Sequence, residues 1–150
     1  MPTRTRSLVA LAVTFALGVA PHAVGIKETA KITISSTVLA QPIEITDPRV
    51  LGLSNVFAGA FIGEQVARPD VAGPHYTIVF DIQTLNGVKT AAYLVVYSKN
   101  RWTGERFIYL PGRGDASYRR NASTILRNGY DGRWHRAADA WGTVIDSHLP

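Results

Sequence analysis

The 150-residue chain contains no cysteine and a single methionine. Without cysteine there is no disulfide, no thiolate nucleophile and no lipidated N-terminal cysteine, and cysteine-based zinc sites are excluded as well. The sequence also lacks a Gly-x-Ser-x-Gly nucleophile motif and a phosphate loop ending in Gly-Lys-Ser/Thr. These absences leave apolar packing to hold the fold, and they give no reason to expect a metal or another cofactor.

Long apolar runs are also missing after the first 25 residues. Within those residues, two arginines precede an uncharged apolar run from Leu8 to Ala20, and a proline and small residues follow. This order predicts a secretory signal peptide over 1–25, cleaved after Gly25. The run is shorter than the roughly 20 residues of a membrane-spanning helix, so a retained anchor is the second interpretation. Residues 26–150 then form a single exported domain.

The excess of basic over acidic residues is small. Lys and Arg number 16 against 11 Asp and Glu, and loss of Arg4 and Arg6 with a signal peptide lowers the net charge from +5 to +3. That excess is too small to indicate nucleic acid as a specific partner. It lies late in the chain, because residues 99–150 hold nine basic and five acidic residues.

Two short segments, 31–35 and 42–46, alternate apolar and polar residues, which predicts half-buried strands. Asp47-Pro48 then predicts the cap and first turn of a short helix. The apolar, glycine-spaced segment 55–63 fits a strand or a loop, and 64–74 is predicted to be a loop.

The clearest pattern is a hairpin over 76–99 with Asn86-Gly87 as its turn, since a type I′ turn needs positive φ at both central residues. Centring the turn there puts four apolar or aromatic pairs on one face: Tyr76 with Tyr97, Ile78 with Val95, Phe80 with Tyr93, and Ile82 with Ala91. A second turn over 100–105 leads to a strand at 106–110, with Phe107 expected opposite Tyr97.

Helical spacing of apolar residues predicts one helix over 116–127, capped by Asp115, and another over 137–147. A short extended stretch is expected between them, within 130–136. Strands come first and helices last. The sequence therefore predicts an α+β domain, in which two C-terminal helices pack on one face of an antiparallel sheet of about four or five strands.

Two of these stretches, IEITDP at 43–48 and YLPGRGD at 109–115, resemble a group of small exported bacterial proteins with no assigned activity. The wider resemblance extends over essentially the whole of 26–150. It implies a single exported domain and transfers no functional residue.

The stretch YLPGRGDASYRRN, residues 109–121, carries the candidate site. Its Arg-Gly-Asp triplet is a weak adhesion signal, because an aspartate that caps a helix turns its carboxylate toward the backbone. The second interpretation is an anion site, in which glycines let the backbone approach and arginines bind phosphate, sulfate or carboxylate. Its predicted members are Gly112, Arg113, Gly114, Arg119, Arg120 and Arg127. The simpler alternative is a strand-to-helix turn followed by a solvated basic face, which is the commoner arrangement.

Other candidate chemistry is less specific. Asp81, Glu105 and Asp115 would serve a two-carboxylate hydrolase only if the fold brings them together. The three histidines after the signal peptide have no metal-ligand spacing and are expected at the surface or at an interface: His75, His135 and His148.

The aromatic residues of the predicted sheet are expected to form the core beneath the helices, with a stacking platform for sugars or bases as the alternative. They are Tyr76, Phe80, Tyr93, Tyr97, Phe107 and Tyr109, with Trp134 and Trp141 completing the core.

We therefore expect an exported, periplasmic or extracellular protein that is a non-enzymatic binding or envelope-associated module. Its basic C-terminal surface would engage an anionic ligand of the envelope or the extracellular space, with no membrane span once the signal peptide is removed. The alternative is a small extracellular hydrolase that acts on a polymer or a phosphoester.

Overall fold

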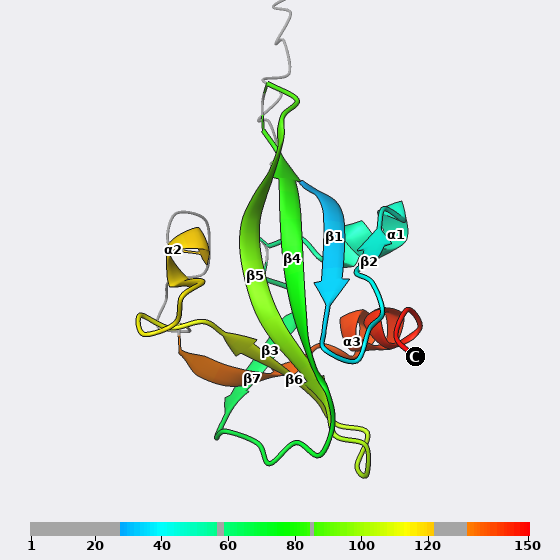
Figure 1. Ribbon diagram of the computed structural model, residues 1–150, viewed down its shortest axis with the longest axis vertical. Helices are drawn as coiled ribbons and strands as arrows, with labels where there is room; N and C mark the ends of the chain where they lie inside the picture. The colour runs from blue at the N-terminus through cyan, green and yellow to red at the C-terminus, as the bar shows by residue number, and fades with distance from the viewer. Residues whose placement is uncertain (1–27, 57–58, 85, 122–131) are drawn as a thin grey trace, which may run out of the picture.

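A computed structural model describes residues 28–56, 59–84, 86–121 and 132–150 (Figure 1). Its strands are β1 (Thr29–Ser35), β2 (Ile43–Ile45), β3 (Ile62–Val66), β4 (His75–Gln83), β5 (Lys89–Lys99), β6 (Arg106–Leu110) and β7 (Arg133–Ala137). Its helices are α1 (Pro48–Leu53), α2 (Tyr118–Asn121) and α3 (Asp139–Asp146). The predicted signal peptide lies outside the described residues.

All of these strands join one sheet in the order β2-β1-β4-β5-β6-β7-β3, and every neighbouring pair is antiparallel. The mainly antiparallel α+β class is as predicted, but the expected four or five strands are too few. The loop predicted over 64–74 is confirmed only from residue 67, because β3 runs from Ile62 to Val66. As an edge strand it exposes Gly63, Glu64 and Gln65, so its sequence shows no apolar alternation.

The β4–β5 hairpin has the predicted register at its open end, where Tyr76 lies opposite Tyr97 and Phe80 opposite Tyr93. Closer to the turn the register shifts by one residue, so that Ile82 faces Thr90 rather than the predicted Ala91. The shift is a β-bulge on β5, which inserts one unpaired residue into the strand.

The hairpin turn explains the bulge. The Thr84 N–H donates to the Val88 carbonyl at 2.9 Å, which encloses three residues rather than the predicted two. Gly87 supplies the positive φ of this turn, at +76°. The extra turn residue displaces the register by one position, and the bulge restores it before the aromatic pairs begin.

The second hairpin forms as predicted, but its register differs by one residue. Tyr97 faces Ile108, and Phe107 faces Ser98. Because successive side chains point to opposite faces of a sheet, Phe107 and Tyr109 lie on the face away from Tyr97. The predicted aromatic row is therefore divided between the two faces.

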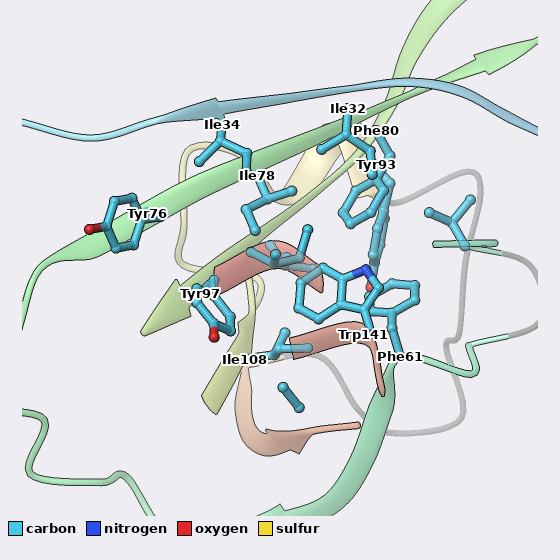
Figure 2. Packing of buried hydrophobic residues seen from close by; sticks show 14 of the residues in the cluster. Ile32, Ile34, Phe61, Tyr76, Ile78, Phe80, Tyr93, Tyr97, Ile108 and Trp141 are labelled. Carbon is cyan, nitrogen blue, oxygen red and sulfur yellow. The ribbon is translucent and has the colours of Figure 1, made fainter. Parts of the chain in front are cut away.

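The hydrophobic core lies on the Tyr97 face, under α1 and α3 (Figures 1 and 2). Trp141 of α3 packs against Tyr97 and Phe61, with ring centroids 5.6 and 5.2 Å away. Its indole N–H donates to the Ser54 hydroxyl at 2.9 Å, so the buried ring keeps its polar group bonded. The expected core is confirmed for Tyr76, Phe80, Tyr93, Tyr97 and Trp141.

α1 begins as predicted, with Pro48 as its first residue and the Asp47 carboxylate accepting from the Arg49 N–H at 2.8 Å. α3 lies within the range predicted for the last helix. The helix predicted over 116–127 is seen only in part. α2 begins at Tyr118, two residues later than predicted, and residues 122–127 lie outside the described residues.

The prediction that two C-terminal helices share one face is wrong. α2 lies beside β5, on the side away from α1 and α3 (Figure 1). The buried Asn121 side chain accepts from the Leu94 N–H at 2.9 Å and donates to the Leu94 carbonyl at 2.6 Å. β6 pairs with β5 only over Val96 to Lys99, so Asn121 replaces a neighbouring strand where that pairing has ended.

Candidate functional site

Asp115 does not cap a helix. Its Oδ2 accepts hydrogen bonds from the Tyr109 hydroxyl at 2.8 Å and from the Gly112 backbone N–H at 2.6 Å. The Gly112 carbonyl accepts in turn from the Asp115 N–H at 2.9 Å, so the two residues close the turn that follows β6. The carboxylate is held toward the sheet, and this geometry does not suit an Arg-Gly-Asp adhesion loop.

The residues predicted to bind an anion occupy different environments. Gly112 is buried and its N–H is bonded to Asp115, whereas Arg113, Gly114, Arg119 and Arg120 are exposed. Arg127 lies outside the described residues. The Gly112 N–H is thus not available to an anion, and anion binding by the arginines stays a prediction.

A hollow lies next to this turn, on the face of the sheet opposite the core. The described residues that line it are Arg68, Tyr109, Asp115, Gly132 and Trp134, and its volume is about 420 Å³. Tyr109 of β6 lies directly opposite Trp134 of β7, so strand pairing places the two rings together. Their centroids are 5.2 Å apart and their planes meet at 38°. Both residues are half-buried.

Polar groups from two further segments border these rings. Arg68 comes from the connection between β3 and β4, and Asp115 from the turn after β6. Burial, and next the hydrogen bond to Asp115, raise the pKa of the Tyr109 hydroxyl, while the positive charge of Arg68 acts in the opposite direction. Tyr109 therefore remains a neutral donor that holds Asp115 in place.

His75 lies beside the same tryptophan, with the His75 and Trp134 ring centroids 6.4 Å apart. Its Nδ1 is hydrogen-bonded to the Ser98 hydroxyl. Ser98 is fully buried, so the pair does not present a nucleophile to a substrate. His75 instead adds an exposed polar group near the aromatic pair.

Chemically, the arrangement offers contacts that can bind a ligand. An aromatic face stacks on planar rings and on the C–H face of sugars, and a guanidinium binds carboxylate or phosphate through two parallel hydrogen bonds. The sequence identified Tyr109 and Asp115 as part of a candidate segment. It assigned Trp134 to the core and did not single out Arg68, because these residues meet only through the pairing of β7 with both β6 and β3.

The three acids considered for hydrolysis have separate partners. Asp81 is 3.6 Å from Lys31, Glu105 is 2.6 Å from Arg136, and Asp115 is bonded to Tyr109. Hydrogen bonds from Arg136, and next from Thr103, lower the pKa of Glu105, which is the wrong direction for a general acid. The described geometry therefore does not favour the hydrolase alternative.

The histidines are placed only partly as predicted. His75 and His148 are exposed, but His135 is fully buried, with Nδ1 3.2 Å from the Gly63 carbonyl. His135 faces Ile108 on the core side of β7, which a lone histidine in the polar stretch Arg-Trp-His-Arg at 133–136 did not indicate. Across the described ranges, no three His, Asp or Glu residues are grouped as metal ligands. In the same part of the chain, no helix has the length and apolar character needed to cross a membrane.

Two other hollows have fewer groups suited to binding a ligand. One of about 520 Å³ lies beside α1, and Glu28 is the one ionisable side chain among the described residues that line it. Another of about 330 Å³ is bordered by Lys99 and Asp146, which bind each other at 2.9 Å and serve to hold α3. Neither combines an aromatic pair with a cation.

Comparison of the chain with protein-family models, with curated proteins and with solved structures gives no match. The resemblance to small exported bacterial proteins therefore stays a prediction, and the function rests on the residues described above.

Proposed function

We propose that this protein is a small, non-enzymatic binding module that holds an acidic saccharide of the cell envelope or the extracellular space. The observation that supports the proposal most directly is the hollow that combines the Tyr109–Trp134 pair with Arg68 and Asp115. Export is expected from the first 25 residues. No observation favours a catalytic function.

The aromatic pair would supply most of the contact area. A ring stacked on an aromatic side chain contributes about 1 to 3 kcal/mol, and two rings allow a ligand to span more than one unit. Both hydrogen bonds to Asp115 fall on Oδ2, so Oδ1 is positioned to accept from a ligand hydroxyl. These contacts suit a sugar, whose ring has an apolar face and a hydroxylated edge.

The charges near the hollow favour an acidic ligand. Arg68 lines the hollow itself, and Arg113, Arg119 and Arg120 lie exposed on the segment that follows Tyr109. Each guanidinium can bind a carboxylate, sulfate or phosphate group in a bidentate manner. Since exposed charges are screened by salt, the ionic part of the affinity should fall as ionic strength rises.

Retention on immobilised acidic polysaccharide, compared with a neutral polysaccharide of the same backbone, tests this function. Arg68→Ala and Trp134→Ala should each weaken retention on the acidic polymer about tenfold or more at low salt. The double variant Arg119→Glu and Arg120→Glu should abolish it. Circular dichroism checks that each variant is folded, which matters most for the half-buried Trp134.

Arg49→Glu is the matched charge control. Arg49 lies on α1 and its side chain is 93% exposed, so the substitution should not disturb the fold. It changes the net charge by the same amount as each of the two charge reversals on α2. It should leave retention unchanged. Retention of the Arg68, Trp134 and double variants at the wild-type level in low salt would reject the proposed function.

A further inference from the structure

Trp102 is the most exposed large apolar side chain among the described residues, at 79% of its full accessible surface. It lies in the turn 100–105 between β5 and β6 and does not line the hollow. The other exposed large apolar residues, Val38, Leu53 and Val88, lie on other turns and on α1. A single exposed apolar residue is common on protein surfaces, so Trp102 indicates a partner only together with the turn that carries it.

The turn that carries Trp102 has an unusual hydrogen-bond pattern, because every backbone N–H from 100 to 105 donates within the protein. The acceptors are the Glu105 carbonyl for Asn100, the Ala72 carbonyl for Arg101, Asn100 Oδ1 for both Trp102 and Thr103, the Asn100 carbonyl for Gly104, and Thr103 Oγ1 for Glu105. Gly104 adopts φ +73°, which lets the chain close these bonds.

Water would satisfy the same N–H groups, so an exposed turn does not need internal acceptors for each of them. At a lipid interface, internal acceptors lower the cost of displacing part of the water around these N–H groups, because an unbonded N–H is costly where water is scarce. The backbone N–H groups of the turn therefore keep their hydrogen bonds where water is scarcer, and the exposed Trp102 ring is carried by this turn.

The charges of the turn indicate which interface fits. The guanidinium of Arg101 lies over the Trp102 ring, 5.9 Å from its centroid, and the residue is exposed. The acid of the turn, Glu105, is paired with Arg136 at 2.6 Å. Among the described residues no acid pairs with Arg101, so its guanidinium can pair with an anionic group at the surface of the turn.

We propose that the turn 100–105 is an interfacial anchor, in which Trp102 enters the headgroup layer of an anionic lipid surface and Arg101 pairs with lipid phosphates. Indole rings prefer this depth, where one edge meets acyl chains and the N–H remains wet. A protein pocket fits the turn less well. Protein interfaces surround a buried anchor with further contacts over about 800 Å² per partner, and the neighbours of Trp102 on this narrow turn are polar.

The attachment should be weak and reversible. One buried lipid chain already gives only marginal binding, and stable anchoring takes two signals. Here the two signals are the indole and one arginine. The protein would therefore bind the membrane surface only transiently, and higher salt should release it.

Vesicle co-sedimentation of the full chain tests the proposal. One set of vesicles is pure phosphatidylcholine, and the other contains equal parts phosphatidylcholine and phosphatidylglycerol. Trp102→Ala should lower the affinity for the anionic vesicles about tenfold, with partial recovery in Trp102→Phe. Arg101→Glu should lower binding to the anionic vesicles alone. All proteins carry the same residues 1–27, so a difference in binding between variants comes from the turn and not from the apolar N-terminal run.

Val88→Ala is the matched control, because Val88 is 59% exposed on the hairpin turn at the opposite end of β5. It should bind as wild type does. Emission quenching by vesicles with brominated acyl chains gives the depth: the quenching seen in wild type should disappear in Trp102→Phe. Equal vesicle binding by Trp102→Ala and wild type, or quenching that persists in Trp102→Phe, overturns the proposal.

This inference is separate from the proposed saccharide site, because it uses other residues. Trp134→Ala and Arg68→Ala should still sediment with anionic vesicles, and Trp102→Ala should still be retained on acidic polysaccharide. If Trp102→Ala instead loses polysaccharide retention with vesicle binding unchanged, the turn is part of the saccharide site and not a membrane anchor.

Discussion

Asp146, at the end of α3, joins the helix to two strands of the sheet. Its carboxylate accepts from the Tyr97 hydroxyl at 2.6 Å, from Arg106 Nε at 2.8 Å and from Lys99 Nζ at 2.9 Å. The side chain is 15% exposed, so these charges are only weakly screened. A single carboxylate thus links the end of α3 to β5 and β6, beside the packing of Trp141 in the core.

Asp146→Asn should destabilise the fold by about 2 to 3 kcal/mol, because it leaves Arg106 and Lys99 partly buried without their counter-charge. Urea unfolding followed by circular dichroism measures this loss. Asp139→Asn is the control on the same helix. Asp139 is exposed in the first turn, where a carboxylate contributes about 0.3 to 1 kcal/mol. Equal losses in the two variants would contradict the role given to Asp146.

The same carboxylate makes stability depend on pH. Burial raises the pKa of Asp146, but the hydrogen bonds from Tyr97, Lys99 and Arg106 outweigh it and leave the pKa below its ordinary value. The folded state therefore favours the ionised form. Its contribution is present above the unfolded pKa of about 3.9 and is lost as pH falls through the lower folded value.

Unfolding free energies measured from about pH 6 down to about pH 2.5 should show this loss in wild type. In Asp146→Asn the part of the slope that comes from this group should be absent, so the two curves should converge at the acid end. Curves that stay parallel across the whole range would show that Asp146 is not ionised preferentially in the fold.

At the scale of the elements, the β4–β5 hairpin shows what the sequence can predict. The alternation of large apolar residues determined the pairing of Tyr76 with Tyr97, because a slip there would expose the aromatic rings. It did not reveal the bulge, since Ala91, Ala92 and Thr90 are small and fit either register. Likewise, the turn 100–105 was found, but its length alone did not decide whether Phe107 or Ile108 faces Tyr97.

The positive φ of Gly87 gives a test of the three-residue turn. Gly87→Ala should cost about 1 kcal/mol, because a Cβ is strained at φ +76°. Gly52→Ala is the paired control: Gly52 lies in α1 and no atom lies within 4 Å of the added Cβ. That variant should be neutral or stabilising by up to about 1 kcal/mol. Thermal unfolding of both proteins measures the contrast, and equal shifts would refute it.

The role of α2 depends on Asn121. Asn121→Ala leaves both the N–H and the carbonyl of Leu94 without their partner, and burial makes this cost about 2 kcal/mol or more. The Leu94 amide should lose its protection from hydrogen exchange. Gln83→Ala, at an exposed amide on β4, should change stability by less than about 0.5 kcal/mol. Unchanged Leu94 protection in Asn121→Ala would mean that α2 does not complete the edge of β5.

On the scale of the whole molecule, the two faces of the sheet differ. One face carries the core beneath α1 and α3, and the other carries Tyr109, Trp134 and the hollow. The sequence predicted that most of the aromatic residues build one core, and it located the segment that contributes Asp115. It could not predict the hollow, because Arg68, Tyr109 and Trp134 come from three segments that meet only when β7 pairs with β6 on one side and with β3 on the other.

The described contacts of the fold begin at Glu28, which makes the domain boundary testable. The Glu28 carbonyl accepts from the Gln83 N–H at 3.2 Å, and the Thr29 hydroxyl donates to the Ser54 carbonyl at 2.8 Å. A chain that starts at Ile26, as expected after signal cleavage, keeps both bonds. It should therefore unfold at the same denaturant midpoint as the full chain.

A chain that starts at Lys31 is the matched comparison, because it loses both bonds and leaves the buried Ser54 carbonyl without its donor. It should be less stable by about 1 to 3 kcal/mol. Mass spectrometry of the processed protein should identify Ile26 as its first residue, as the predicted cleavage after Gly25 requires. A chain from Ile26 that is as unstable as the chain from Lys31 would show that residues before the predicted cleavage point belong to the folded domain.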